Sequence, residues 1–307
     1  MTGLSGDDVR RTTKVEQMIL NEIYTLNNGV TIPKLGLGTW MIDDEKSAQV
    51  VRDAVQIGYR HFDTAQAYGN EHGVGEGIRD CGVARDDLFV TSKLAAEIKS
   101  LAGAREAIDG SLRTMGLDMI DMMIIHSPQP WAEFRQGEHY FEGNLEAWRA
   151  LEEALASGKL RAIGVSNFEQ VDLDNILENG SVKPAVNQIL AHVTNTPFKL
   201  IEHTTSKDVL VEAYSPIGHG EVLNNRELGT MAAKYGVGVP QLCIRYCLQL
   251  GLLPLPKTAT PGHMRSNAAV DFTIDDADME ALKNAAPIKD YGEAGAFPVY
   301  GDNARSD

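Results

Sequence analysis

Four polar residues stand at or just after the ends of short apolar segments. Asp63 lies in RHFDTA, Lys93 closes DLFVTSK, His126 closes MIDMMIIH, and Tyr68 follows Asp63 by five residues. A tyrosine hydroxyl is a weak acid with a pKa of about 10, and a nearby ammonium group favours its phenolate form. A tyrosine beside a lysine is therefore suited to donate a proton to an oxygen that gains negative charge.

Each of these residues also has an ordinary structural interpretation, as a turn cap (Asp63), a solvated charge (Lys93), a packed ring (His126) or a rim aromatic (Tyr68). Their combination at equivalent positions favours a catalytic set. Asp63 would hold Lys93 charged and in place, and His126 would orient a bound carbonyl group by hydrogen bonding. The set suits addition of hydride to a C=O group, with Tyr68 protonating the developing alkoxide.

The elements that must position this set are short strands. Apolar segments begin near residues 35, 60, 87, 119, 160, 184, 208 and 252, and amphipathic stretches separate them. Strands that are apolar on both faces and alternate with helices are typical of a buried parallel sheet. Eight such units predict an α/β fold of the TIM (β/α)8 barrel type, whose active site forms at the C-terminal ends of the strands.

No linker or low-complexity tract interrupts the central part of the chain. We therefore expect a flexible N-terminal extension over residues 1–20 and a single barrel domain over 21–307. EIYTLNNGVTIPKLG carries an Asn-Asn-Gly turn and predicts an N-terminal β-hairpin. The Gly-rich stretch from residue 290 predicts a C-terminal loop over one end of the barrel.

The segment GVGEG, over residues 73–77, is also rich in glycine. Gly73, Gly75 and Gly77 in GVGEG resemble a phosphate-binding set, but they fall inside a predicted helix with no strand leading into it. A dinucleotide fingerprint requires the order strand, turn, helix. We therefore predict a helix here and no phosphate site.

Composition narrows the class of protein. With 28 Lys and Arg against 43 Asp and Glu, the net charge is −15, which disfavours nucleic-acid or anionic-membrane partners. Cys243 and Cys247 lie four residues apart without further ligands nearby, so we expect reduced, buried thiols and no metal site. The chain has no membrane-length apolar run and its start lacks a signal h-region, so we expect a cytoplasmic protein.

Seven segments occur in an order that resembles a known family. RHFDTAQAYGNEHGVG, LFVTSKL, IDMMIIHSP, AIGVSNF, PAVNQI, VEAYSPIG and LPKTATP are similar to the signature segments of the aldo-keto reductases, over about residues 22–286. The short loops after IIHSP and SPIGHG are similar to the prokaryotic branch that includes 2,5-diketo-gluconate reductases. The resemblance implies NADPH-dependent reduction of aldehydes and ketones, with Asp63, Tyr68, Lys93 and His126 as the catalytic four.

The resemblance also implies which residues bind cofactor and substrate. Nine positions match the family's cofactor contacts: Ser166, Asn167 and Gln188 for the carboxamide, Tyr214 for the nicotinamide ring, Ser215 and Ile217 for the pyrophosphate, Lys257 and Thr258 for the 2′-phosphate, and Asn267 for the adenine. His263, at the position of a further 2′-phosphate contact, is the tenth cofactor residue that we expect. Trp40 matches an aromatic wall of the substrate pocket, which His126 also lines.

Three departures from the family pattern qualify these expectations. Ala95 and Ser127 stand where aromatic residues are usual, which predicts a wider substrate rim. The resemblance implies NADP(H) as the cofactor, but His263 stands where an arginine is usual, so NAD(H) stays open as an alternative. The partner is expected to be a small carbonyl compound, and the oligomeric state and physiological substrate stay open.

Two other functions are known for barrels of this kind. Some barrels of this family serve as non-catalytic, cofactor-binding redox sensors, and the intact catalytic four argues against that role. A sugar-phosphate isomerase would need a glycine-rich phosphate loop after strand seven or eight, and LPKTATPG lacks a glycine pair.

Overall fold

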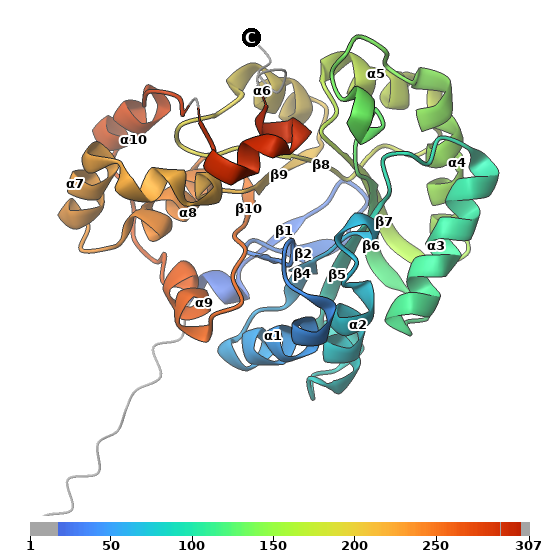
Figure 1. The fold of residues 1–307 in the computed structure, drawn as a ribbon, viewed down its shortest axis with the longest axis horizontal. Helices are drawn as coiled ribbons and strands as arrows, with labels where there is room; N and C mark the ends of the chain where they lie inside the picture. Colours follow the sequence, from blue (N-terminus) through green and yellow to red (C-terminus); the bar gives the residue numbers. More distant parts are fainter. Residues whose placement is uncertain (1–17, 289, 302–307) are drawn as a thin grey trace, which may run out of the picture.

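Eight parallel strands form one sheet that curls into a barrel. The computed structural model describes residues 18–288 and 290–301. In sequence order the barrel strands also neighbour one another in space (Figure 1). They are β3 (Leu37–Gly38), β4 (His61–Asp63), β5 (Phe89–Leu94), β6 (Ile120–Ile125), β7 (Leu160–Ser166), β8 (Val186–Leu190), β9 (Leu210–Tyr214) and β10 (Leu253–Leu255). The predicted TIM barrel is confirmed.

The barrel closes where β10 returns to β3. The backbone N–H of Gly36 donates to the carbonyl of Pro254 at 3.3 Å, and that of Gly38 donates to Pro256 at 3.1 Å. A Cβ atom at Gly36 would lie 2.5 Å from a side-chain atom of Leu255 and 2.7 Å from the His61 ring. Glycine is therefore required at this point because the two edges approach so closely.

Helices form the outer ring around these strands (Figure 1). They are α1 (Asp44–Ile57), α2 (Glu71–Asp80), α3 (Leu101–Met115), α4 (Phe141–Ala156), α5 (Gln170–Asn179), α6 (Phe198–Ser206), α7 (Arg226–Lys234), α8 (Val239–Gln249), α9 (Pro261–Ala268) and α10 (Asp276–Lys283). Among the described residues, no helix is long and apolar enough to cross a bilayer.

The three glycines of GVGEG lie in α2, as predicted. A Cβ at Gly73 would lie 2.1 Å from the carbonyl oxygen of Asp44, and one at Gly75 would lie 2.2 Å from that of Met115. At Gly77 it would lie 2.6 Å from Cβ of Val51. These glycines therefore allow α2 to pack closely on its neighbours, which accounts for them without a phosphate.

The predicted hairpin consists of β1 (Ile23–Thr25) and β2 (Thr31–Pro33), which pair antiparallel. The Asn27 amide in its turn donates to the carbonyls of Pro184 and Asp208, which precede β8 and β9. The hairpin thus caps the N-terminal ends of the strands. Residues 18–20, assigned above to the flexible extension, form a 3-10 turn whose Ile19 is buried; residues 1–17 of that extension lie outside the described part.

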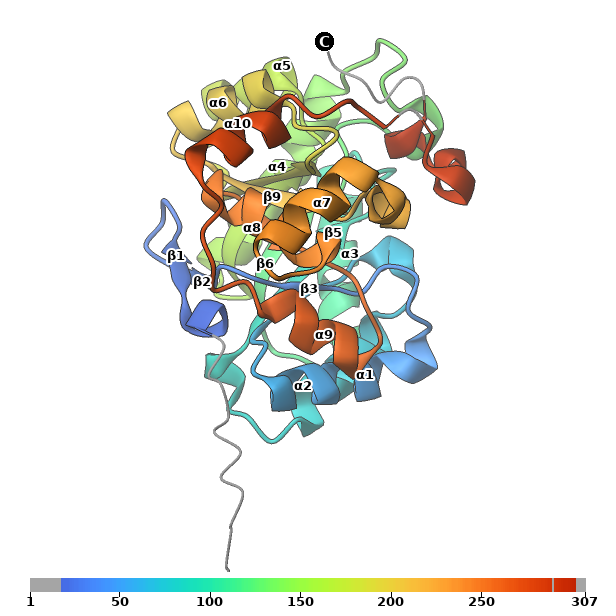
Figure 2. The ribbon, with the colours of Figure 1, turned by 90° about the vertical axis from the view of Figure 1, so that its left-hand side faces the viewer.

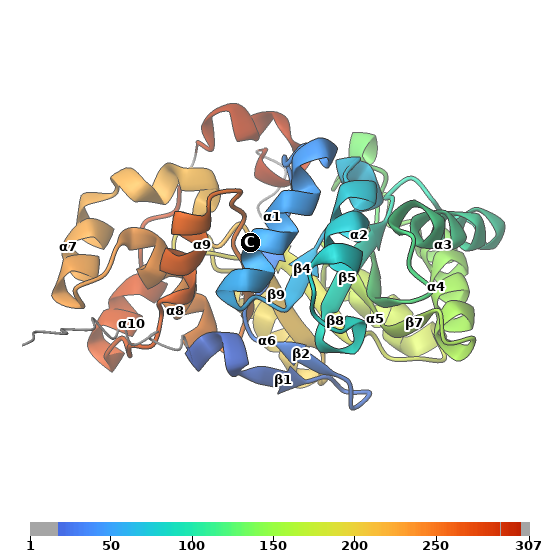
Figure 3. The ribbon, with the colours of Figure 1, turned by 90° about the horizontal axis from the view of Figure 1, so that it is seen from below.

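The C-terminal segment lies at the opposite end of the barrel from the hairpin (Figures 2 and 3). It contains two short 3-10 helices, η6 (Gly292–Ala296) and η7 (Pro298–Tyr300). The ring of Tyr300 stacks at 6.3 Å from that of Trp40, and its hydroxyl lies 2.5 Å from the Ser215 hydroxyl. The described part of the tail is therefore a loop over the C-terminal ends of the strands, and residues 302–307 lie outside the described part.

Candidate active site

Asp63, Lys93 and Tyr68 form one compact charged cluster at the C-terminal ends of β4 and β5. The Lys93 ammonium donates to Asp63 Oδ1 at 2.5 Å and to the carbonyl of Thr64 at 2.9 Å. The same Nζ lies 4.9 Å from the centre of the Tyr68 ring. Lys93 has no exposed surface and Asp63 is 4% exposed, so this ion pair acts in a poorly hydrated environment where its field is strong.

Burial and the neighbouring charges have opposite effects on the pKa values of Tyr68 and Lys93. Burial raises the pKa of Tyr68, and the Lys93 charge partly offsets that rise. Burial alone would lower the pKa of Lys93, but the charges of Asp63 and Tyr68 together hold it above its usual value. Tyr68 is therefore a protonated phenol at neutral pH, and Lys93 is a cation placed to stabilise its phenolate.

His126 completes the four. It follows β6 and its ring packs edge-on against Tyr68 at 5.6 Å. Burial, with a smaller contribution from Lys93, lowers the pKa of His126 well below its usual value, so the imidazole is neutral. Within the described residues its Nδ1 has no hydrogen-bond partner. The structure thus brings all four predicted residues together, with a neutral imidazole packed against the Tyr68 ring.

The residues expected to hold the carboxamide gather next to this cluster. The Ser166 hydroxyl donates to the backbone carbonyl of Gln188 at 2.8 Å, and the Asn167 amide donates to the carbonyl of His126 at 3.0 Å. Tyr214 donates its hydroxyl to Asn167 Oδ1 at 2.7 Å. A cavity of about 90 Å³ opens beside Asn167 and Tyr214 and extends to Arg135.

The residues expected along the rest of the cofactor lie on the loops that follow β9 and β10 and on helix α9. Ser215 faces Tyr300 as described, and Ile217 follows in the same loop. Lys257 is exposed and follows β10, while Thr258 is 8% exposed. His263 is exposed in the first turn of α9, and Asn267 is buried in its last turn.

These positions fit a nicotinamide dinucleotide. Buried amides and hydroxyls converge at the ends of β7 and β8, where a carboxamide needs donors and acceptors. At the far end, Lys257 stands near the N-terminus of α9, and a helix N-terminus favours a phosphate through its free N–H groups and dipole. Ser166, Asn167, Gln188 and Tyr214 would hold one end of the cofactor, and Lys257, Thr258, His263 and Asn267 the other.

The substrate rim differs from the expectation. Ser127 is fully buried and its hydroxyl accepts from the N–H of Gln129, so this position faces a turn. Trp131 instead places its ring 5.0 Å from that of His126. The aromatic bulk that we expected to be missing after His126 is thus supplied from four residues further along the loop, and the wide rim predicted from Ser127 is wrong.

Trp40 lies between Tyr68 and the C-terminal segment. Its ring lies 6.4 Å from that of Tyr68 and 4.8 Å from that of Phe297 in the C-terminal segment. With Tyr300, which stacks on Trp40, and Trp131, which meets His126, these rings make an aromatic rim beside Tyr68 and His126. The sequence identified Trp40 but not Trp131, Phe297 or Tyr300.

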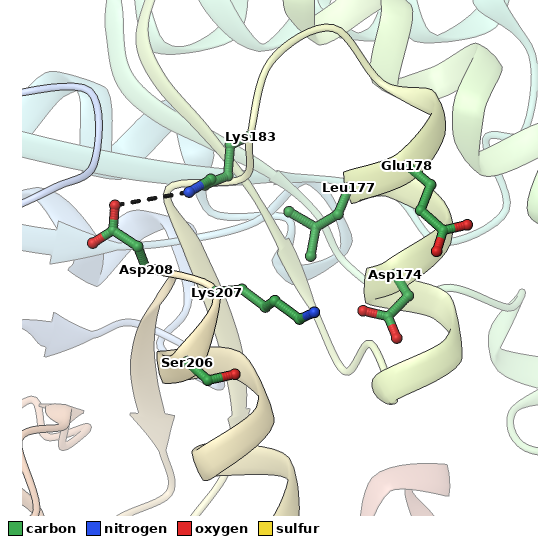
Figure 4. A pocket seen from close by; sticks show the side chains of 7 residues that line it. All are labelled: Asp174, Leu177, Glu178, Lys183, Ser206, Lys207 and Asp208. Atoms are coloured by element: carbon green, nitrogen blue, oxygen red, sulfur yellow. Dashed lines mark ion pairs between the residues drawn. The ribbon is translucent and has the colours of Figure 1, made fainter.

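A larger surface hollow lies elsewhere. It has a volume of about 340 Å³ and lies between α5, α6 and the residues that precede β8 and β9 (Figure 4). Lys183 and Asp208 form an ion pair at 3.8 Å on its wall. Because it opens at the N-terminal ends of the strands, it is separate from the catalytic cluster.

Known proteins with similar sequences and structures place the chain in one family. Residues 34–287 match the model of the Aldo/keto reductase family. Glyoxal reductase of Bacillus subtilis (strain 168) is 36% identical over 265 residues, which cover 86% of this chain and 92% of that protein. Morphine 6-dehydrogenase of Pseudomonas putida is 35% identical over 275 residues, which cover 85% and 90%. A crystal structure of an aldo/keto reductase from Brucella melitensis has a TM-score of 0.79 at 34% identity and covers 86% of this chain and 97% of that one.

Proposed function

The chain belongs to the aldo/keto reductase family, and on that premise we propose that it reduces aldehydes and ketones to alcohols with NADPH, using Tyr68 as the proton donor. Family membership makes it a nicotinamide-dependent oxidoreductase that acts on carbonyl groups. The observation that supports the finer proposal is the buried Lys93–Asp63 pair held against the Tyr68 ring beside a neutral His126.

Each residue of the cluster has one task in this proposal. When bound, the nicotinamide cofactor supplies the hydride. Tyr68 gives its hydroxyl proton to the carbonyl oxygen as negative charge develops there. Lys93 stabilises the phenolate left on Tyr68, and Asp63 keeps the ammonium charged and in place. His126, being neutral, orients the carbonyl oxygen through a ring N–H.

A direct assay tests the proposal. The purified chain is mixed with NADPH and a series of aldehydes and ketones, and loss of NADPH absorbance is followed together with formation of the alcohol. We expect turnover with at least the small, reactive aldehydes. Tight NADPH binding without turnover on any carbonyl would instead favour a non-catalytic, redox-sensing role.

Changing His263 tests the preference for NADPH. An arginine carries a permanent charge and a fork of donors that suits a phosphate, which a histidine lacks. His263→Arg should raise the ratio of kcat/KM for NADPH over NADH about tenfold, the effect of one added charge-assisted hydrogen bond. Ala269→Arg, exposed at the other end of α9, adds the same charge and should leave the ratio unchanged. Equal shifts in both variants would mean that position 263 does not face the phosphate.

Changing Trp131 tests the shape of the substrate rim. The indole occupies space beside His126, so Trp131→Ala should raise kcat/KM for bulky ketones relative to a small aldehyde by roughly fivefold, the size of effect that a few methylene groups produce in a pocket. Ser127→Ala should not alter this ratio, because the Ser127 side chain faces a turn. An unchanged size profile in the Trp131 variant would place the substrate on another side of the opening.

A further inference from the structure

A fifth ionisable residue, Glu212, reaches the catalytic cluster from the middle of β9. It has no exposed surface, and it pairs in register with Gln188 of β8. Its Oε2 accepts from the Gln188 amide at 2.8 Å, so its side chain points into the barrel. Burying a carboxyl group is costly unless its hydrogen bonds are satisfied, yet Oε1 of Glu212 has no partner among the described residues.

We propose that Glu212 is a positioning residue for the reduction: it fixes the Gln188 amide for the cofactor and, through Gln188, restrains Asp63. The inference rests on the proposed function and deepens it. Glu212 forms no hydrogen bond or ion pair with Lys93 or Tyr68, so it would act only through its neighbours.

The Gln188 amide is the link in this arrangement. Its single Nε2 donates one hydrogen to Glu212 Oε2 and the other to Asp63 Oδ2, at 2.8 and 2.9 Å. The Asp63 carboxylate and the unprotonated oxygen of the Glu212 carboxyl group both accept, and an amide nitrogen only donates, so the two carboxyl groups determine which way the amide faces. The amide oxygen is then left to accept a hydrogen bond, and the carboxamide –NH₂ of a nicotinamide is a donor. Without Glu212, one of the two anchors of this orientation is lost.

The environment of Glu212 also determines its protonation state. Burial, and then the charge of Asp63, raises the pKa of Glu212 to about 8. At neutral pH the carboxyl group is therefore mostly protonated, which agrees with one oxygen accepting from Gln188 while the other is free to carry the proton. The charged or polar groups that act on it are Asp63 from β4, Lys93 from β5 and Gln188 from β8.

The direction of the pH effect follows from these charges. Above pH 8 Glu212 gains a negative charge that acts on Asp63 and Lys93, the ion pair beside Tyr68. Added negative charge disfavours the phenolate and makes Tyr68 a weaker acid. Reduction should therefore slow as Glu212 ionises, before Tyr68 itself loses its proton, because burial raises the pKa of Tyr68 above its ordinary value.

Two variants separate the roles. Glu212→Gln keeps an acceptor for Gln188 but cannot ionise, so its kcat at neutral pH should stay within about threefold of the parent and the decline near pH 8 should disappear. Glu212→Leu removes the acceptor, so the Kd for NADPH, measured by quenching of protein fluorescence, should rise about tenfold, the effect of one lost hydrogen bond.

A matched control is available in Glu71. It is also a buried carboxyl whose pKa burial raises, but it bonds to Ser92 from α2 and does not touch Gln188. Glu71→Gln should leave both the NADPH affinity and the alkaline decline unchanged. Thermal unfolding of each variant separates local effects from misfolding, and should Glu212→Leu fail to fold, the pH profile of Glu212→Gln alone decides.

The outcomes distinguish this proposal from the proposed function. If the parent binds NADPH but reduces no carbonyl, the proposed function fails, and the two Kd values for NADPH still test whether Glu212 positions Gln188. If Glu212→Gln keeps the parent's decline near pH 8, or Glu212→Leu binds NADPH as tightly as the parent, the assignment of Glu212 is overturned.

Discussion

Replacing Tyr68 with phenylalanine is expected to lower kcat for carbonyl reduction by about 10²–10⁴-fold, the contribution of a well-placed general acid. The change removes only the hydroxyl group, and the ring keeps its packing against His126 at 5.6 Å. NADPH binding, followed by fluorescence quenching, should therefore be nearly unchanged. Turnover that survives within a factor of ten of the parent would mean that the proton comes from another group.

A second tyrosine provides the control for this experiment. Tyr246 is fully buried and its hydroxyl lies 2.9 Å from that of Thr196, away from the catalytic cluster. Tyr246→Phe removes the same atom from a buried ring and should leave kcat unchanged. A comparable loss in both variants would show that the effect comes from disturbed packing and not from proton transfer.

The proximity of the four residues proposed as catalytic could be predicted from the sequence, because the arrangement of parallel strands in a barrel determines it. Asp63, Lys93 and His126 each end or follow a strand, and a barrel brings the C-terminal ends of its strands to one face. Short apolar segments were sufficient to locate these strands, since buried parallel strands are apolar on both faces. The same property hid Glu212, because a strand without polar alternation does not reveal which side chains point into the barrel.

The substrate rim could not be predicted in this way. Trp131 lies in an irregular loop where no period fixes the direction of a side chain, and its approach to His126 depends on that loop's own contacts. Tyr300 meets Ser215 and Trp40 across a large sequence separation. Long-range contacts between loops leave no local pattern in the sequence, so the two departures at Ala95 and Ser127 gave an incomplete picture of the pocket.

Lys93→Met should be the second most damaging change. It removes the charge that stabilises the Tyr68 phenolate, and we expect kcat for reduction to fall by about 10²–10³-fold. Lys93 also offsets the rise that burial causes in the pKa of Tyr68, so its loss should raise that pKa further. Alcohol oxidation, which needs the phenolate as a base, should then require a higher pH than in the parent.

Stability is affected for a separate reason. The Asp63 carboxylate is only 4% exposed. Without Lys93 it keeps the Gln188 amide as a hydrogen-bond donor but has no cation beside it. Removing one partner of a buried ion pair costs about 3–5 kcal/mol, so Lys93→Met alone should unfold at a clearly lower temperature. This loss could by itself lower activity, and the single variant does not separate the two causes.

The double variant Asp63→Asn/Lys93→Met separates them. It replaces the ion pair with two neutral side chains, so no uncompensated charge remains buried, and most of the lost thermal stability should return. Turnover should stay as low as in Lys93→Met, because the cation beside Tyr68 is still absent. The measurements are the unfolding temperature and kcat for the parent, both single variants and the double variant. If kcat recovers together with stability, Lys93 serves the fold and not the reaction, and the proton transfer must be explained without its charge.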